Sequence, residues 1–153
     1  MNKEEIIDTL NDLIAVCNDG KEGFKACAHN AKIESLKLRT LLAKCSLECE
    51  LAADALIAMV RDEGGVPVTG TTASGTLHRG WLNVKTAITG KTDRAVLEEC
   101  ERGEDVAKSA YLKALAKAPP PHIRLLVERQ YQGVLNNHEQ IKALRDEAKS
   151  LHV

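Results

Sequence analysis

Six side chains that could bind a metal or carry redox chemistry fall on or beside the apolar stripes of the predicted helices. They are Cys17, Cys45, Cys49, Cys100, Glu104 and His138. Thiolates favour zinc, Cu(I) or the iron of iron–sulfur clusters, whereas carboxylate and imidazole groups favour iron or manganese. If these side chains meet in one buried layer, they form a metal or redox-thiol site. If they do not, the cysteines simply fill the core as small apolar residues.

The spacing of the cysteines directs two thiols to the same side of one helix. Cys45 and Cys49 are four residues apart, so they can hold one metal ion between them. When the chain is folded back at its two predicted reversals, the remaining candidates come to about the same height in the core. The sequence therefore predicts a site for a zinc, copper or iron ion formed by Cys45, Cys49, Cys100, Glu104 and His138.

Each predicted ligand also has an ordinary structural role, and we favour that role for each residue taken singly. Reduced cysteines are among the most buried residues and pack like small apolar side chains. Glu104 can reach solvent or pair with Arg102 or Lys108. His138 can be a hydrogen-bonded residue at the boundary of the core. Both interpretations stay open at the level of sequence.

The elements that would position these residues are helices, because apolar residues recur at steps of three and four. The predicted long helices span 3–29, 34–63, 93–117 and 121–151, and a shorter one spans 74–89. Asn2 can cap the first helix, Gly64 and Gly65 end the second, and Pro121 suits the first turn of the last.

Helices of this length pack best nearly parallel, which predicts an all-α four-helix bundle. The joint near Ala31 and the prolines at 119–121 make the first pair and the last pair antiparallel. The link from Gly64 to Thr92 is long enough to run along the bundle, so we predict the ferritin-like crossover with a short extra helix inside it. The alternative is an up-down bundle with the short helix folded outside.

Composition and charge exclude several classes of function. The chain has 153 residues, 44% of them hydrophobic, and a net charge of −1, which suits one globular domain covering residues 1–153. Basic and acidic residues are interspersed, so we expect no nucleic-acid partner. No secretory pattern opens the chain and no apolar run is long enough for a membrane span. We therefore expect a cytoplasmic protein with reduced cysteines and no membrane partner.

Four short segments resemble a bacterial family of ferritin-like four-helix-bundle proteins with a domain of unknown function. These segments are Leu10–Ile14, Cys17–Gly20, Leu77–Trp81 and Glu99–Asp105. The resemblance covers nearly the whole chain. It implies a ferritin-like fold and a cytoplasmic bacterial protein, and it implies no particular activity.

The chain departs from the metal-binding pattern of ferritin-like di-iron proteins. Those proteins supply a glutamate from each of two helices and Glu-x-x-His from each of the other two. Here Glu128 is followed by Tyr131 in place of histidine, and His138 is preceded by Leu135 in place of glutamate. No Glu-x-x-His is present on the bundle helices, so a standard di-iron site is not expected.

Sequence alone supports one favoured function and two alternatives. A phosphate-binding glycine loop, a CxxC pair and a serine elbow are all absent. We favour a non-catalytic binding or assembly protein that lacks a standard di-iron site and carries no cofactor. The alternatives are a metal-binding or redox protein using the Cys/Glu/His cluster, and an atypical di-iron oxidoreductase. We expect a homo-oligomer, most simply a dimer, with Trp81 in an exposed apolar patch.

Overall fold

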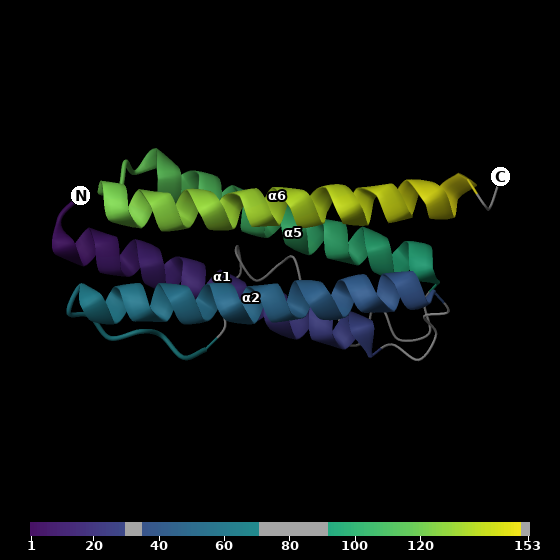
Figure 1. The fold of residues 1–153 in the computed structure, drawn as a ribbon, viewed down its shortest axis with the longest axis horizontal. Coiled ribbons are helices and arrows are strands. Elements are labelled where there is room, and N and C mark those ends of the chain that lie inside the picture. Colours follow the sequence, from purple (N-terminus) through teal and green to yellow (C-terminus); the bar gives the residue numbers. More distant parts are fainter. Residues whose placement is uncertain (30–34, 71–91, 151–153) are drawn as a thin grey trace.

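A computed structural model describes residues 1–29, 35–70 and 92–150, and these residues build an elongated four-helix bundle (Figure 1). The helices are α1 (Lys3–Ala28), α2 (Leu36–Asp62), α5 (Asp93–Ala116) and α6 (Pro121–Ser150). All four agree with the predicted ranges to within two residues at each end. The predicted short helix at 74–89, including Trp81, lies outside the described residues.

The helices begin at residues that suit the unpaired backbone N–H groups of the first turn. Asn2 Oδ1 accepts a hydrogen bond from the Glu5 amide at 2.8 Å, and the Glu5 carboxylate accepts one from the Asn2 amide, so the predicted cap at Asn2 is confirmed and forms a capping box. Ser35 and Thr92 cap α2 and α5 with their hydroxyl oxygens, which accept the amides of Leu38 and Ala95. Pro121 opens α6, where its missing N–H leaves no hydrogen bond unmade.

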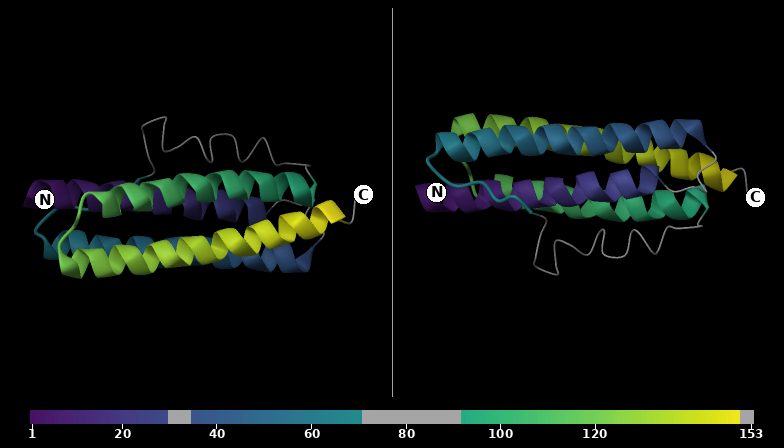
Figure 2. Two further views of the ribbon diagram at one scale, coloured as in Figure 1. Left: turned by 90° about the horizontal axis from the view of Figure 1, so that it is seen from above. Right: turned by 90° about the horizontal axis from the view of Figure 1, so that it is seen from below.

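The connection between the two helix pairs decides the topology. The helices form two layers, one of α1 and α5 and one of α2 and α6 (Figure 2). Helices α1 and α2 are antiparallel, as are α5 and α6, whereas α2 and α5 run in the same direction (Figure 1). Because α2 and α5 are parallel, the link from the end of α2 to the start of α5 must run along the length of the bundle. The crossover is therefore confirmed, and the up-down alternative is wrong.

The start of this crossover is tied to α1 by two asparagine side chains. Asn11 donates to the Val66 carbonyl at 3.2 Å and accepts from the Val68 amide at 3.0 Å. Asn18, two turns farther along α1, donates to the Gly70 carbonyl at 2.9 Å. The link thus follows α1 toward the middle of the bundle, and its backbone groups find partners there.

The interior contains two apolar clusters, one toward each end of the bundle. One cluster is centred on Phe24, Leu42 and Cys100, and the other on Leu10, Leu56 and Tyr111. Within the described residues, no helix combines the length and apolar content needed to cross a membrane. The two clusters leave the centre of the bundle incompletely filled.

Candidate functional site

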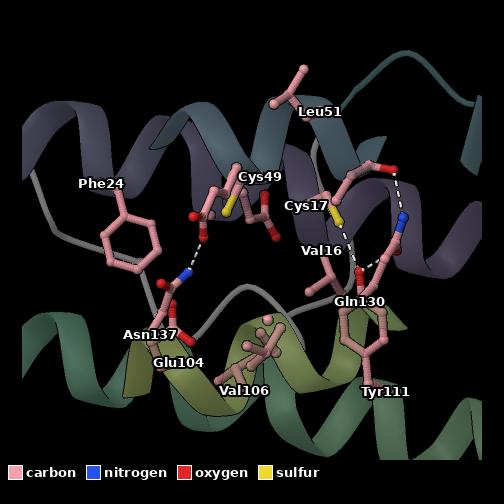
Figure 3. A pocket seen from close by; sticks show the side chains of 18 of the residues that line it. Val16, Cys17, Phe24, Cys49, Leu51, Glu104, Val106, Tyr111, Gln130 and Asn137 are labelled. Carbon is pink, nitrogen blue, oxygen red and sulfur yellow. Dashed lines mark hydrogen bonds between the residues drawn. The ribbon is translucent and has the colours of Figure 1, made fainter. Parts of the chain in front are cut away.

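A cavity of about 380 Å³ lies at the middle of the bundle, between the two apolar clusters (Figure 3). All four helices contribute to its wall. The apolar part of the wall includes Val16, Phe24, Leu51, Ala52, Val106 and Leu126. The cavity is therefore a pocket within the bundle rather than a groove on one helix pair.

Small residues on each helix create this space. The glycines and alanines that line it are Gly20, Ala52, Ala55, Gly103, Ala107 and Gly133. Gly20 also lets α1 and α2 approach closely, because an added Cβ would lie 2.9 Å from Cys49 Sγ. At Gly133, by contrast, an added Cβ would meet nothing within 4 Å. The sequence thus leaves volume here that larger side chains would otherwise occupy.

The mouth of the cavity lies between α2 and α6. The exposed lining residues, Leu51, Arg129 and Gly133, all come from these two helices, whereas the lining residues of α1 are buried. A small molecule could therefore enter from the α2–α6 side. The deepest groups lie against α1 and α5.

One end of the cavity carries buried oxygen acceptors. The Glu104 side chain on α5 and Asn137 on α6 lie side by side there (Figure 3) and are only 4% and 6% exposed. Asn137 Nδ2 donates to Glu48 Oε2 at 2.6 Å. Neither Glu104 Oε2 nor Asn137 Oδ1 has a hydrogen-bond partner among the described residues. Two buried acceptors are thus left for a group that could occupy the cavity.

Burial keeps the Glu104 carboxyl protonated at neutral pH. Loss of solvation, with smaller contributions from the nearby charges of Glu48 and Asp105, raises its pKa from 4.5 to about 8. About nine-tenths of the molecules therefore carry a neutral Glu104 at pH 7. A cation placed beside this group would reverse the effect by favouring the carboxylate.

The other end of the cavity is closed by a hydrogen-bonded chain that joins all four helices. The Tyr111 hydroxyl donates to Gln130 Oε1 at 2.8 Å, and Gln130 Nε2 donates to the Ala52 carbonyl at 3.1 Å. Cys17 Sγ lies 3.2 Å from the Tyr111 oxygen and therefore donates to it, since the tyrosine proton is already used. These polar groups satisfy one another, so this end of the cavity is a structural closure.

The structure separates the five predicted metal ligands into three environments. Cys49 and Glu104 line the cavity. Cys45 and Cys100 are fully buried in the apolar cluster around Phe24 and do not line it. His138 Nε2 pairs with Asp105 Oδ1 at 3.2 Å, with its side chain 13% exposed. Across the described parts of the chain, no three or more His, Cys, Asp or Glu side chains are grouped so as to hold a metal ion.

Burial keeps the thiols in the protonated form. It raises the pKa of Cys17 to about 11, and it is also the main reason that the pKa values of Cys45, Cys49 and Cys100 lie above the usual range. A thiol is a poor nucleophile and a poor metal ligand until it loses its proton. These cysteines therefore behave as apolar packing groups unless a metal displaces the proton.

Two residues of the cavity were not among the predicted ligands. Asn137 occupies the inner position of α6 that the prediction gave to its neighbour His138. The alternating four- and three-residue steps from Ile123 through Val127, Gln130 and Val134 lead to Asn137, and this was the signal that could have found it. The other residue, Glu48, meets Asn137 across 89 positions of sequence, a pairing that local pattern does not reveal.

The fold and its central cavity define a ferritin-like four-helix bundle. The chain is similar to the bacterioferritin-related protein from Bacteroides fragilis, described as a dodecameric thioferritin, with a TM-score of 0.76 over 99% of this chain and 91% of that one. The sequences are 12% identical, so the likeness shows the fold alone. The predicted ferritin-like fold is thereby confirmed.

Residues 5–117 match the family described as Domain of unknown function (DUF2383), and the chain belongs to that family. This agrees with the resemblance seen in the sequence. None of the curated proteins matches the chain.

The donors around the cavity do not fit a di-iron centre. Ferritin-like di-iron sites combine four glutamates with two histidines. Among the described residues that line this cavity, none is a histidine, and the carboxylates are Asp19, Glu48 and Glu104. The chemistry of a di-iron oxidase therefore has no basis in these side chains.

Proposed function

We propose that this protein is a non-catalytic binding protein that holds a small, largely apolar molecule inside its bundle. The cavity of about 380 Å³ falls within the size range of small-molecule sites, and apolar walls with a few fixed polar groups are typical of such sites. The observation that carries the proposal is the pair of partnerless buried oxygens on Glu104 and Asn137. Each leaves about 1–3 kcal/mol of hydrogen bonding unrealised, which a ligand could supply.

The state of the thiols supports binding rather than catalysis. Cys17 donates to Tyr111, and its pKa of about 11 leaves almost no thiolate at neutral pH. Cys49 is held protonated by burial in the same way. The cavity therefore offers shape and hydrogen bonds but no activated nucleophile.

Thermal unfolding in the presence of a series of linear alcohols of increasing length tests this proposal. A ligand at 100 times its Kd stabilises the folded state by about 2.7 kcal/mol. For a chain of this size, that free energy raises Tm by about 5–10 °C. We expect the rise to peak at one chain length, because the cavity has a fixed volume.

A variant that narrows the mouth of the cavity tests whether the alcohols bind inside it. Gly133→Leu projects a side chain into open space at the mouth and should abolish the rise in Tm. Ala58→Leu adds the same side chain at an exposed position of α2 that does not line the cavity, and should leave the rise unchanged. A rise that is equal in both variants would show that the alcohols bind elsewhere.

A second candidate function is binding of a single metal ion, favoured by Cys49 and Glu104 lining the same cavity. Elemental analysis of anaerobically purified protein should then show stoichiometric zinc, copper or iron. A variant with both Cys49→Ser and Glu104→Gln should lose the metal, whereas Cys27→Ala, in the apolar cluster, should keep it. Metal that persists in the double variant would rule out this site.

We also propose that the whole chain folds as one domain, resides in the cytoplasm and assembles with copies of itself. Large apolar side chains are exposed on three helices: Leu36, Leu47 and Leu51 on α2, Leu112 on α5 and Leu125 on α6. The structurally similar protein from Bacteroides fragilis is dodecameric, which agrees with self-assembly of this fold. Sedimentation of the purified protein distinguishes a dimer from a larger assembly or a monomer.

A further inference from the structure

When Glu104 is ionised, the polar end of the cavity presents more hydrogen-bond acceptors than donors. One N–H of the Asn137 side-chain amide is donated to Glu48, and neither the Asn137 oxygen nor Glu104 Oε2 has a partner among the described residues. Asp19 on α1 adds a third acidic side chain to the wall. A ligand that satisfies this end must therefore bring donors of its own.

Among the described residues, the lysine that pairs with Glu48 and the arginine that lines the cavity both lie away from this end. Lys44 pairs with the other oxygen of Glu48 at 3.6 Å and is 47% exposed, so it lies on the solvent side. Arg129 lines the cavity but precedes Asn137 by eight residues on α6, which is about 12 Å along the helix. In the part of the chain that the structure describes, no lysine or arginine therefore pairs with the acceptors at Glu104 and Asn137.

Resting on the proposed function, we infer that the ligand is an alkylamine-like molecule: an apolar body in the cavity and an ammonium head between Glu104, Glu48 and Asn137. An ammonium group is compact and carries three donors, which matches these three acceptors. Its charge also offsets the acidic wall. The apolar lining residues, which include Val106 and Leu126, accommodate the hydrocarbon body.

Proton exchange at Glu104 gives this inference a distinctive pH dependence. An ammonium head favours the Glu104 carboxylate, so binding at neutral pH releases the Glu104 proton to solvent. Affinity should rise as pH increases toward the Glu104 pKa of about 8 and level off above it, while the amine stays protonated up to about pH 10. If only the carboxylate form of Glu104 binds the amine, the affinity for the amine rises by up to about 90-fold between pH 6 and pH 9. Among the described residues, the charged or titratable side chains around Glu104 are those of Asp19, Glu48, Asp105, Tyr111 and the four cysteines Cys17, Cys45, Cys49 and Cys100, with Lys44 on Glu48 and His138 on Asp105.

Calorimetric titration with octylamine, octanol and octanoate at pH 8 tests the inference. We expect octylamine to bind at least tenfold more tightly than octanol, and octanoate to bind most weakly. Glu104→Gln keeps the shape of the side chain but cannot ionise, so it should lose most of the preference for octylamine over octanol and all of the pH dependence. Glu48→Gln provides a second variant that should reduce the preference for the amine.

The outcomes distinguish failure of the ammonium site from failure of the proposed small-molecule binding function. If octanol binds wild-type protein as tightly as octylamine, or if Glu104→Gln retains the preference for the amine, the ammonium site is refuted and the binding cavity stands. If none of the three molecules binds, both proposals fail. Circular dichroism of each variant confirms that the helical bundle is intact.

Discussion

The buried Glu104 carboxyl should make the stability of the protein fall steadily as pH rises. Its pKa is about 8 in the folded protein and about 4.5 in the unfolded chain. Between these values the folded state holds a proton that the unfolded state has released. Stability is therefore full below about pH 4.5, falls through the window between the two values, and is constant again above about pH 8.

The magnitude follows from the width of that window. Each pH unit corresponds to about 1.4 kcal/mol, so the free energy of unfolding attributable to Glu104 falls by about 3 kcal/mol at pH 7 and by up to about 5 kcal/mol above pH 8. The side chain is only 4% exposed, so solvent screening reduces these figures little. Glu104→Gln mimics the protonated carboxyl and removes the titration. The variant should therefore match wild type near pH 4.5 and exceed its stability by several kcal/mol at pH 9.

Urea unfolding of both proteins between about pH 5 and pH 9 measures this difference directly. Subtracting the two curves cancels the titration of the other groups, which are common to both. Glu139→Gln, at an exposed position of α6, serves as the matched control and should show no such slope. A difference between wild type and Glu104→Gln that stays constant across this range would refute the burial argument.

Three further substitutions probe the elements that surround the cavity. Gly133→Ala should raise the free energy of unfolding by up to about 1 kcal/mol in urea, because the added methyl group meets open space and alanine favours the helix. Tyr111→Phe should lower it by about 1–3 kcal/mol, since Gln130 Oε1 loses its donor in the interior; a change below measurement error would contradict that role. Asn11→Ala removes two hydrogen bonds to the crossover and should cost about 1–2 kcal/mol, with faster hydrogen exchange of the Val68 amide as the local readout.

The sequence was sufficient to predict the architecture, because the helix ends and the apolar stripes are determined by local, periodic patterns of residues. Asn2 at the start of α1 and Pro121 at the start of α6 act within one turn of helix, so both were predicted correctly. The crossover followed from the length of the link alone. No long-range contact had to be known for any of these predictions.

The site was less accessible, because it depends on the rotation and register of helices that are distant in sequence. A rotation of α6 by one position exchanges Asn137 for His138, which is the difference between a cavity acceptor and a partner of Asp105. Glu48 acquires its role only through Asn137, which lies on the last helix. Glu104 was identified as a candidate, but its isolation from Arg102 and Lys108 required the packed structure.

The cavity and the buried carboxyl are both costly to the isolated protein, and one ligand would relieve both costs. An empty cavity costs about 24 cal/mol per Å³, so a volume of about 380 Å³ corresponds to at most about 9 kcal/mol, and water entering between α2 and α6 lowers this figure. That upper limit is comparable to the whole stability of a typical domain. Larger side chains at Gly133 or Ala107 would remove the space, and a residue at position 104 that cannot ionise would remove the cost of burying the carboxyl. An apolar body with a cationic head would fill the volume and pair with the Glu104 carboxylate, which is why we attribute the two features to a single bound molecule.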